Sequence, residues 1–380
     1  MERDQNQTPG GRTKRSGGSA PNEVKSEARR GRAGNSTSSN RRVTMKDIAL
    51  RAGVSRATVG FVLSGDNSPV QISEETQRRV RAVADELQYR PNSVARAMRS
   101  GRFGSVALIL STVRTHSIIP VPLLDGIHDA LAKHDLLLVL TRMPDEKLTS
   151  DGFVPKILRE SSSDGLIINY NANIPAEMIQ LVHSHQIPAV WVNSRQKADC
   201  VYPDDFGGLY QAVQILVEKG HRRIAYVDLS LSSHYSAVDR AAGYEQGMND
   251  AGLIPQTVRP FGVHHTDVAR SVPCIREVLE GADRPTAVLT YSPHNVVALM
   301  LAVQQTRLRV PEDLSVMTVA EAASQNFGLT FDTMVLPEYP MGEEAVEMLI
   351  AKINDPAMVC KPRALPLTYQ AAQTVAAKLS

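Results

Sequence analysis

Residues 43–99 read VTMKDIALRAGVSRATVGFVLSGDNSPVQISEETQRRVRAVADELQYRPNSVARAMR, which has the pattern of a helix-turn-helix followed by a short segment that opens after a proline. Thr44 and Ser55 are suitable N-caps for two successive helices, and Gly53 between them permits a tight turn. Ser73 is a suitable N-cap for a third helix. Apolar residues at helical spacing should form a small common core: Ile48, Ala49, Ala52, Val59, Val62, Leu63, Val80, Val83, Ala84 and Leu87.

The second of these helices is the expected DNA-reading element. In a helix-turn-helix this helix enters the major groove, and its first residues meet base edges. Arg56 can donate two hydrogen bonds to guanine or clamp a phosphate, whereas Ala57 and Phe61 offer apolar contact that suits a thymine methyl group. Ser55, Thr58 and the first backbone N–H groups can bind phosphates. The alternative is a small helical bundle in which Arg56 is only solvated.

The segment that follows, 91–98, has a separate expected role. Pro91 can open a helix because its missing N–H is not needed there. So short a helix is unstable alone in water, so it would fold only when docked on DNA or on a symmetry mate. Met98 could then wedge into a base step in the minor groove and kink the duplex. The alternative is a linker with Met98 packed on the rest of the protein.

Charge is distributed unevenly along the 380 residues. Residues 1–103 hold 20 Lys and Arg against 10 Asp and Glu, whereas the remainder holds 22 basic and 30 acidic residues. A basic N-terminal part is the electrostatic footprint of polyanion binding, although basic termini also serve as solubilising tails. Residues 1–42 are rich in Gly, Ser, Asn and Arg with little to bury, which predicts a disordered basic tail.

Several classes of protein are disfavoured by what the sequence lacks. Three widely separated cysteines, Cys200, Cys274 and Cys360, match no zinc spacing and suggest reduced thiols in a cytosolic protein. No run approaches the roughly 18 apolar residues of a membrane span, and the N-terminus has no apolar signal core. Phosphate-loop, nucleophile-elbow, zinc-protease and dinucleotide motifs are missing. We therefore expect no enzyme, no cofactor and no metal. No third ligand accompanies His183 and His185, and His264 and His265 are expected in a surface loop.

Beyond residue 104 apolar runs alternate with amphipathic segments. Strand-like runs lie at 106–110, 136–140, 166–168, 189–192, 224–227, 287–290 and 315–319. Helical patterns lie between most of them, for example at 123–134, 209–219, 241–251 and 296–306. This alternation predicts parallel sheets with helices on both faces. About 270 residues suit two such lobes better than one.

A family resemblance covers nearly all of 43–370. It is carried by VTMKDIALRAGVSRATVGFVLS, ISEETQRRVRAVADELQYRPNSVARAMRSGR, DGLII (164–168), D-x-x-x-G (204–208), KGHRRIAYV (219–227), R-x-x-G-Y (240–244), VPEDLSV (310–316) and MGEEAVEML (341–349). In this order they resemble the LacI/GalR family of bacterial transcription regulators. The resemblance implies an all-α helix-turn-helix headpiece and an α/β two-lobed, periplasmic-binding-protein-like body with parallel sheets in Rossmann-like lobes. Such proteins are dimeric repressors, sometimes activators, whose hinge helix inserts a leucine at the operator centre and whose body binds a small effector, usually a sugar or nucleobase.

On this basis the domains are expected as follows: a disordered basic tail at 1–42, a helix-turn-helix domain at 43–90, a hinge helix and linker at 91–103, and an effector-binding and dimerisation domain at 104–380. The first lobe would take about 104–200 and 336–361, and the second about 203–333 and 362–380.

The resemblance also suggests site residues. The expected DNA contacts are Thr44, Ser55, Arg56, Ala57, Thr58, Phe61, Asn92, Ser93, Ala95 and Met98. Arg240 matches the arginine that commonly holds the effector. Further candidates lie just upstream of it or at strand ends, where ligands bind in such folds: His234, Ser236, Asn193, Tyr170, Ser111 and His116. For each of these, a role in loop hydrogen bonding is the alternative.

The chain also departs from the family pattern. Gly60 and Phe61 stand where Ser and Arg usually end the recognition helix, so the operator should differ at that position. Two pocket signatures are replaced, Gly-Phe-Asp-Asp by residues 318–321 (TVAE) and Asn-Asp by 292–293 (SP). Those carboxylates commonly bind sugar hydroxyls or purine nitrogens. Their loss favours a more anionic or more apolar effector, or a body that no longer senses.

We therefore predict a cytoplasmic, nucleoid-associated, sequence-specific homodimeric repressor that binds a palindromic double-stranded operator, responds to a small molecule and has no membrane partner. One alternative is a solute-binding or transport module in which 43–99 is incidental. Another is an architectural DNA-binding protein whose body does not sense.

Overall fold

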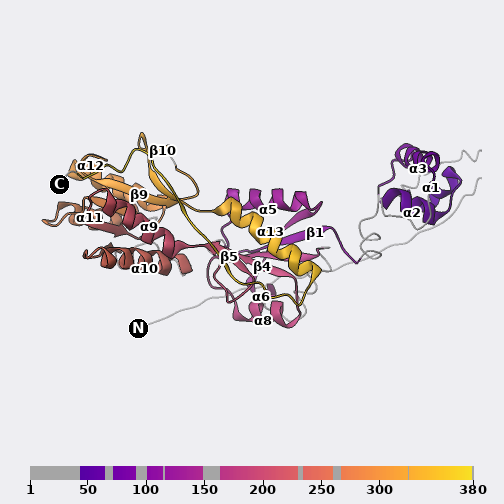
Figure 1. Ribbon diagram of the computed structural model, residues 1–380, viewed down its shortest axis with the longest axis horizontal. Coiled ribbons are helices and arrows are strands. Elements are labelled where there is room, and N and C mark those ends of the chain that lie inside the picture. Colours follow the sequence, from indigo (N-terminus) through magenta and orange to yellow (C-terminus); the bar gives the residue numbers. More distant parts are fainter. Residues whose placement is uncertain are drawn as a thin grey trace, which may run out of the picture. The chain divides into compact units, whose positions relative to one another are not determined.

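The computed structural model describes residues 43–64, 72–90, 101–113, 116–148, 163–229, 234–259, 267–323 and 325–378 (Figure 1). The chain divides into two compact units, Met1–Arg90 and Pro91–Ser380. We call the described part of the first unit the headpiece and that of the second unit the body. The predicted tail at 1–42 and residues 91–100 of the predicted hinge lie outside the described residues.

The headpiece contains the predicted helices α1 (Met45–Ala52), α2 (Arg56–Ser64) and α3 (Glu74–Glu86). The Asp47 carboxylate accepts hydrogen bonds from the Thr44 backbone N–H (2.8 Å) and hydroxyl (2.7 Å) at the start of α1. Gly53, at φ 66°, ends that helix in the left-handed conformation that glycine adopts without strain. The predicted core is present, with Ile48, Ala49, Ala52, Val59, Val62, Val80 and Ala84 buried, and Leu63, Val83 and Leu87 packed against them.

The body is built on two six-stranded sheets. The first has the order β13-β5-β4-β3-β1-β2 and is entirely parallel. The second has the order β14-β12-β9-β8-β6-β7, and only its edge strand β14 is antiparallel. The strands of the first sheet are β1 (Ser105–Ser111), β2 (Leu137–Met143), β3 (Gly165–Asn169), β4 (Ala189–Val192), β5 (Cys200–Pro203) and β13 (Arg363–Leu365). Those of the second are β6 (Ile224–Val227), β7 (Gln256–Val258), β8 (Ala287–Thr290), β9 (Ser315–Ala320), β12 (Asp332–Val335) and β14 (Thr368–Gln370).

Helices cover both faces of each sheet, as the alternation predicted (Figure 1). In β1, which is buried throughout, Val106, Leu108 and Leu110 pack with α5 (Val121–Lys133) and α13 (Glu338–Asn354). The alternate residues, Ala107 and Ile109, pack with α8 (Ala176–Ser184). In the second sheet, α11 (Val268–Glu280) and α12 (Pro293–Thr306) share one core, and α9 (Asp205–Glu218) and α10 (Tyr235–Asp250) share the other. Two small elements complete the body: helix α6 (Asp145–Leu148) and the hairpin of β10 (Gln325–Asn326) and β11 (Leu329–Thr330).

The chain passes between the two sheets after β5, after β12 and after β13. The first lobe, defined here by the first sheet and its helices, therefore includes Cys200–Pro203 and Arg363–Leu365. The boundaries expected from the sequence placed the first lobe at about 104–200 and 336–361. In the structure its two segments extend to residues 203 and 365, because β13 pairs with β5. The predicted fold class, an all-α headpiece with a two-lobed α/β body, is confirmed.

Candidate DNA-binding surface and ligand cavity

The first turn of α2 is exposed while the rest of the helix is anchored in the headpiece core. Arg56 and Ala57 are exposed, whereas Val59 and Val62 are buried. Ser55 caps the helix, because its hydroxyl oxygen accepts a hydrogen bond from the Thr58 backbone N–H at 3.0 Å. The arrangement presents a guanidinium, a methyl group and helix N-terminal N–H groups from a rigid support, which is the chemistry needed to contact bases and phosphates.

The other predicted DNA contacts differ in where they lie. Thr44 is exposed at the start of α1, where its side chain is bonded to Asp47. Phe61 is half-buried one turn along α2 from the exposed residues, and Gly60 precedes it. Four predicted contacts of the hinge lie outside the described residues: Asn92, Ser93, Ala95 and Met98.

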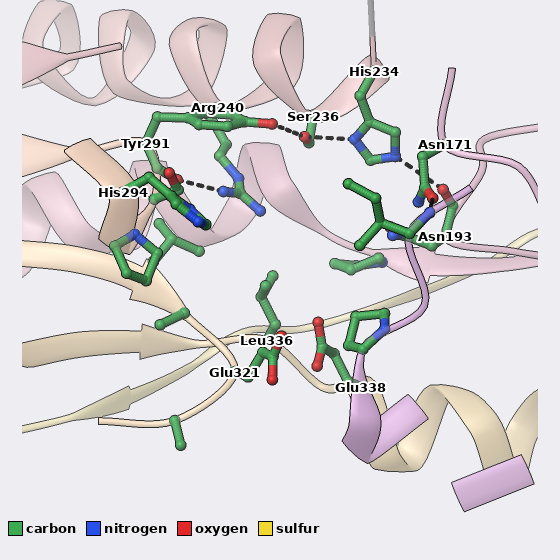
Figure 2. Close-up of a pocket in the computed structure, with 18 residues that line it drawn as sticks. Asn171, Asn193, His234, Ser236, Arg240, Tyr291, His294, Glu321, Leu336 and Glu338 are labelled. Atoms are coloured by element: carbon green, nitrogen blue, oxygen red, sulfur yellow. Dashed lines mark hydrogen bonds between the residues drawn. The ribbon is translucent and has the colours of Figure 1, made fainter. Parts of the chain in front are cut away.

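The body contains a cavity of about 520 Å³ where the ends of the two sheets face each other. Parallel α/β sheets bind ligands at the carboxyl ends of their strands, and this cavity lies at such a position in both lobes. Its lining (Figure 2) combines apolar side chains with a few polar groups: Ile118, Pro120, Asn171, Asn193, Pro203, His234, Ser236, Arg240, Tyr291, Ser292, Pro293, His294, Val319, Ala320, Glu321, Ala322, Leu336 and Glu338.

A chain of hydrogen bonds crosses the cavity from one lobe to the other (Figure 2). The Tyr291 hydroxyl lies 2.8 Å from Ser236 Oγ, which lies 2.7 Å from His234 Nδ1. His234 Nε2 lies 2.9 Å from the Asn193 carbonyl oxygen, which belongs to the first lobe. Asn193 has φ 53°, a left-handed conformation that asparagine tolerates better than most residues.

The protonation state of His234 follows from these partners. Burial lowers the pKa of His234, although the Asn193 carbonyl opposes this shift. A carbonyl oxygen only accepts, so Nε2 of the neutral ring donates to it, and Nδ1 accepts from the Ser236 hydroxyl. The Ser236 oxygen is then left to accept from Tyr291, and the donors of the whole chain are aligned in one direction.

Arg240 is held rigidly at the cavity wall by groups of the second lobe. Its Nε donates to Asp205 Oδ1 at 2.6 Å and its Nη1 to the Tyr291 carbonyl at 2.5 Å, and the guanidinium lies 4.7 Å from the centre of the Tyr291 ring. Burial opposes the charge, but the Asp205 carboxylate outweighs it and raises the pKa of Arg240. The ion pair is buried on both sides, with side-chain exposures of 7% and 1%. Arg240 is therefore a permanently charged, preorganised donor whose charge is already compensated.

Three of the predicted ligand contacts lie away from this cavity. Tyr170, Ser111 and His116 all bond to the carboxylate of Asp145, with 2.5 Å from the Ser111 hydroxyl and 2.9 Å from His116 Nδ1. Against the effect of burial, these bonds hold the pKa of Asp145 below its ordinary value. The expected strand ends are correct, but alternation along the chain turns Tyr170 into the core, and its neighbour Asn171 lines the cavity instead.

Four of the predicted ligand contacts, Arg240, His234, Ser236 and Asn193, do come together in the cavity. Sequence reasoning missed Asn171, Tyr291 and Glu338, which also line it, and Asp205, which holds Arg240. The sequence did carry a signal for Asp205, because this residue is the second of the D-x-x-x-G motif at 204–208. Glu338 gave no signal, because it precedes the recognised MGEEAVEML segment and lies at no predicted strand end.

Two protein-family models match the chain. The model for bacterial regulatory proteins of the lacI family matches residues 44–92, and the model for the periplasmic binding protein-like domain matches residues 213–373. The first match contains all three headpiece helices. The second contains most of the second lobe and α13.

Similar proteins align with more than four fifths of the chain. The HTH-type transcriptional repressor PurR of Vibrio atlanticus is 27% identical over 321 residues, which are 82% of this chain and 92% of that repressor. The ribose operon repressor of Haemophilus influenzae is 27% identical over 318 residues, with the same coverages. Among solved structures, the lac repressor dimer bound to operator and the anti-inducer ONPF has a TM-score of 0.71 at 23% identity, covering 89% of this chain and all of that one. This last similarity is one of fold.

Proposed function

The chain belongs to the LacI family of bacterial regulatory proteins, and from that premise we propose that it is a homodimeric transcriptional repressor whose operator binding is controlled by a small molecule. The observation that carries the proposal is the exposed first turn of α2, with Arg56 and Ala57 outermost, inside the segment that the lacI-family model matches. The function is regulatory, with no catalytic step, and a cytoplasmic, nucleoid-associated location is part of the proposal. In the described part of the chain, no helix is both long and apolar enough to span a membrane.

On the DNA side, we assign base-edge contact to Arg56, Ala57 and Phe61, and backbone contact to Thr44, Ser55 and Thr58. Arg56 would pair with a guanine, and the two apolar side chains would select a thymine methyl group. The sequence-based assignment of Asn92, Ser93, Ala95 and Met98 to hinge contacts remains part of the proposal. Two copies related by a two-fold axis would read a palindromic operator.

On the ligand side, we assign effector contact to Arg240, Ser236, Asn193 and Asn171. The cavity is lined by both lobes, so an effector that touches both would bind most tightly when they close around it. The hydrogen bond between His234 and the Asn193 carbonyl joins the lobes at this point, and it is the bond that such a motion would change. Different affinity for two lobe arrangements is what couples a ligand to DNA binding.

Selection of bound duplexes from a random pool tests the proposal with the full-length protein. We expect enrichment of a palindrome with two half-sites, because a symmetric dimer places α2 twice. Equal binding of scrambled and selected duplexes would contradict a repressor and would favour an architectural DNA-binding protein. A protein that retained no DNA at all would instead fit a solute-binding module.

Replacing Arg56 with alanine should weaken binding to the selected operator by about 1–3 kcal/mol and relax the preference at one base pair, because a bidentate contact to guanine would be lost. Titration of labelled duplexes that differ at single positions measures both effects. Arg78, exposed on α3, provides a matched control. Arg78→Ala removes the same charge and should leave the preference at that base pair intact. A uniform loss for Arg56→Ala on every sequence would make its contact one to phosphate.

A further inference from the structure

The charged groups around the cavity do not balance. Arg240 is compensated by Asp205, which is buried behind it at 2.6 Å. Glu321 and Glu338 also line the cavity, and no described cationic side chain makes an ion pair with either. His234 and His294 are the other titratable side chains of the lining besides Tyr291. The cavity therefore presents an excess of carboxylate to whatever binds in it.

Glu338 is the more informative of the two acids. It is only 6% exposed, and within the described chain its Oε2 is fully buried without a hydrogen-bond partner. Burying a carboxylate without a partner is costly, so native proteins pair such groups or protonate them. Burial and the neighbouring Glu321 carboxylate raise the pKa of Glu338 to about 8, against the opposing effect of Arg240. At neutral pH Glu338 therefore favours its protonated form, since no described cationic side chain pairs with it.

We propose that the ligand of this cavity is an organic ammonium ion, bound through its charged nitrogen by the carboxylates of Glu338 and Glu321. The inference deepens the proposed function, on which it rests, by naming the chemical class of the effector. Figure 2 shows the two carboxylates close together and well separated from His234. An ammonium group supplies the donors and the charge that both acids lack.

The remaining walls define the rest of such a ligand. Ile118, Val319 and Leu336 are among the apolar side chains that line the cavity, which suits a ligand with a hydrocarbon or ring body. The donors of Tyr291, Ser236 and His234 are used within their chain, so at the other end the Tyr291 hydroxyl oxygen can accept a hydrogen bond from a ligand hydroxyl. The sequence alone left open a more anionic effector, a more apolar effector or a body that does not sense. The charge distribution that Glu338 contributes disfavours the anionic one.

Matched pairs of probes that differ in one group provide the test: tyramine with tyrosol, and glucosamine with glucose. In each pair an ammonium replaces a hydroxyl in a molecule of nearly the same shape. Calorimetric titration of the full-length protein should show at least one ammonium compound binding roughly 10- to 100-fold more tightly than its neutral partner, the usual effect of a charged hydrogen bond. Equal affinities within both pairs, or no binding by either ammonium compound at millimolar concentration, would overturn the proposal.

Two further readouts identify the residue responsible. Near pH 7 tyramine, whose amine stays protonated in this range, should displace about one proton from Glu338, so the binding enthalpy should depend on the buffer. Its affinity should rise as the pH approaches 8 and level off above that value. Glu338→Gln should abolish both the proton release and the preference for the ammonium compound, while its melting temperature reports that it is folded. Glu347→Gln, on the exposed side of the same helix, should change neither. Proton release that persists in Glu338→Gln would contradict the assignment.

The same samples separate this inference from the proposed function. Operator binding with and without the ammonium compound shows whether binding is coupled to DNA. If operator binding is intact and the neutral partners bind as well as the ammonium compounds, the charge assignment fails and the regulator stands. If the ammonium compound binds through Glu338 and no palindrome is selected, the regulator fails and the charge assignment stands.

Discussion

Replacement of Arg240 with alanine should lower the free energy of unfolding of the body by about 3–5 kcal/mol, because it would leave the Asp205 carboxylate buried without a partner. The same change removes the bond to the Tyr291 carbonyl and a charged wall of the cavity, so ligand-dependent stabilisation should also be lost. Urea denaturation followed by circular dichroism measures the first effect, and a thermal shift with a bound ligand measures the second.

Two further variants test whether the expected loss of stability in Arg240→Ala is caused by the burial of its ion pair. Lys133 forms an ion pair of similar length, 2.8 Å, with Glu343, but its side chain is 63% exposed. Lys133→Ala should therefore leave the free energy of unfolding nearly unchanged, because solvent screens an exposed pair. The double replacement Arg240→Met with Asp205→Leu removes both charges and should recover most of the lost stability. An Arg240→Ala protein as stable as Lys133→Ala would show that the buried pair contributes little.

The second large effect is expected at Gly342, where α13 and α5 meet backbone to backbone. A Cβ atom there would lie 2.6 Å from the Ile127 nitrogen and 2.7 Å from the Leu123 carbonyl oxygen. Because backbone atoms of α5 cannot move aside as a side chain can, Gly342→Ala should destabilise the body by about 3 kcal/mol, at the upper end of overpacking effects. The only tryptophan of the chain, Trp191, is buried in the first lobe and reports its unfolding by fluorescence.

Gly281 provides the matched control for this substitution. A Cβ atom there would meet nothing closer than 3.5 Å, and its φ of −65° is open to any residue. Gly281→Ala should change stability by about 0.5 kcal/mol or less. If the two alanine variants proved equally stable, the close approach of α5 and α13 would not require glycine.

The strands that could be predicted from the sequence are those that the structure buries on both faces. The runs predicted at 189–192, 224–227 and 287–290 coincide with β4, β6 and β8, because central strands covered on both faces are continuously apolar. Edge strands carry less of this signal. β13 (Arg363–Leu365) begins with an exposed arginine, and β14 (Thr368–Gln370) contains two polar residues, so their pairing is set by neighbours distant in the sequence.

The ligand site was predictable only in part, for a related reason. Strand ends identify the edge of a sheet at which ligands bind, and Asn193 was found in this way, whereas Arg240 was found from the resemblance carried by R-x-x-G-Y. Strand ends do not show which way each side chain turns, so Tyr170 was expected where Asn171 lies. Glu338 could not be found, because its importance depends on burial beside Glu321, a residue 17 positions earlier in the chain.

The chain of the body passes between the two sheets three times, so neither lobe is a continuous segment of the sequence. Each sheet receives an edge strand from the last part of the chain, β13 for one and β14 for the other. A truncated gene product ending before residue 363 would therefore lack an edge strand in each sheet, and neither lobe would be intact. Chimeric regulators made from this protein should accordingly exchange 104–378 as a single cassette, with the junction placed ahead of β1.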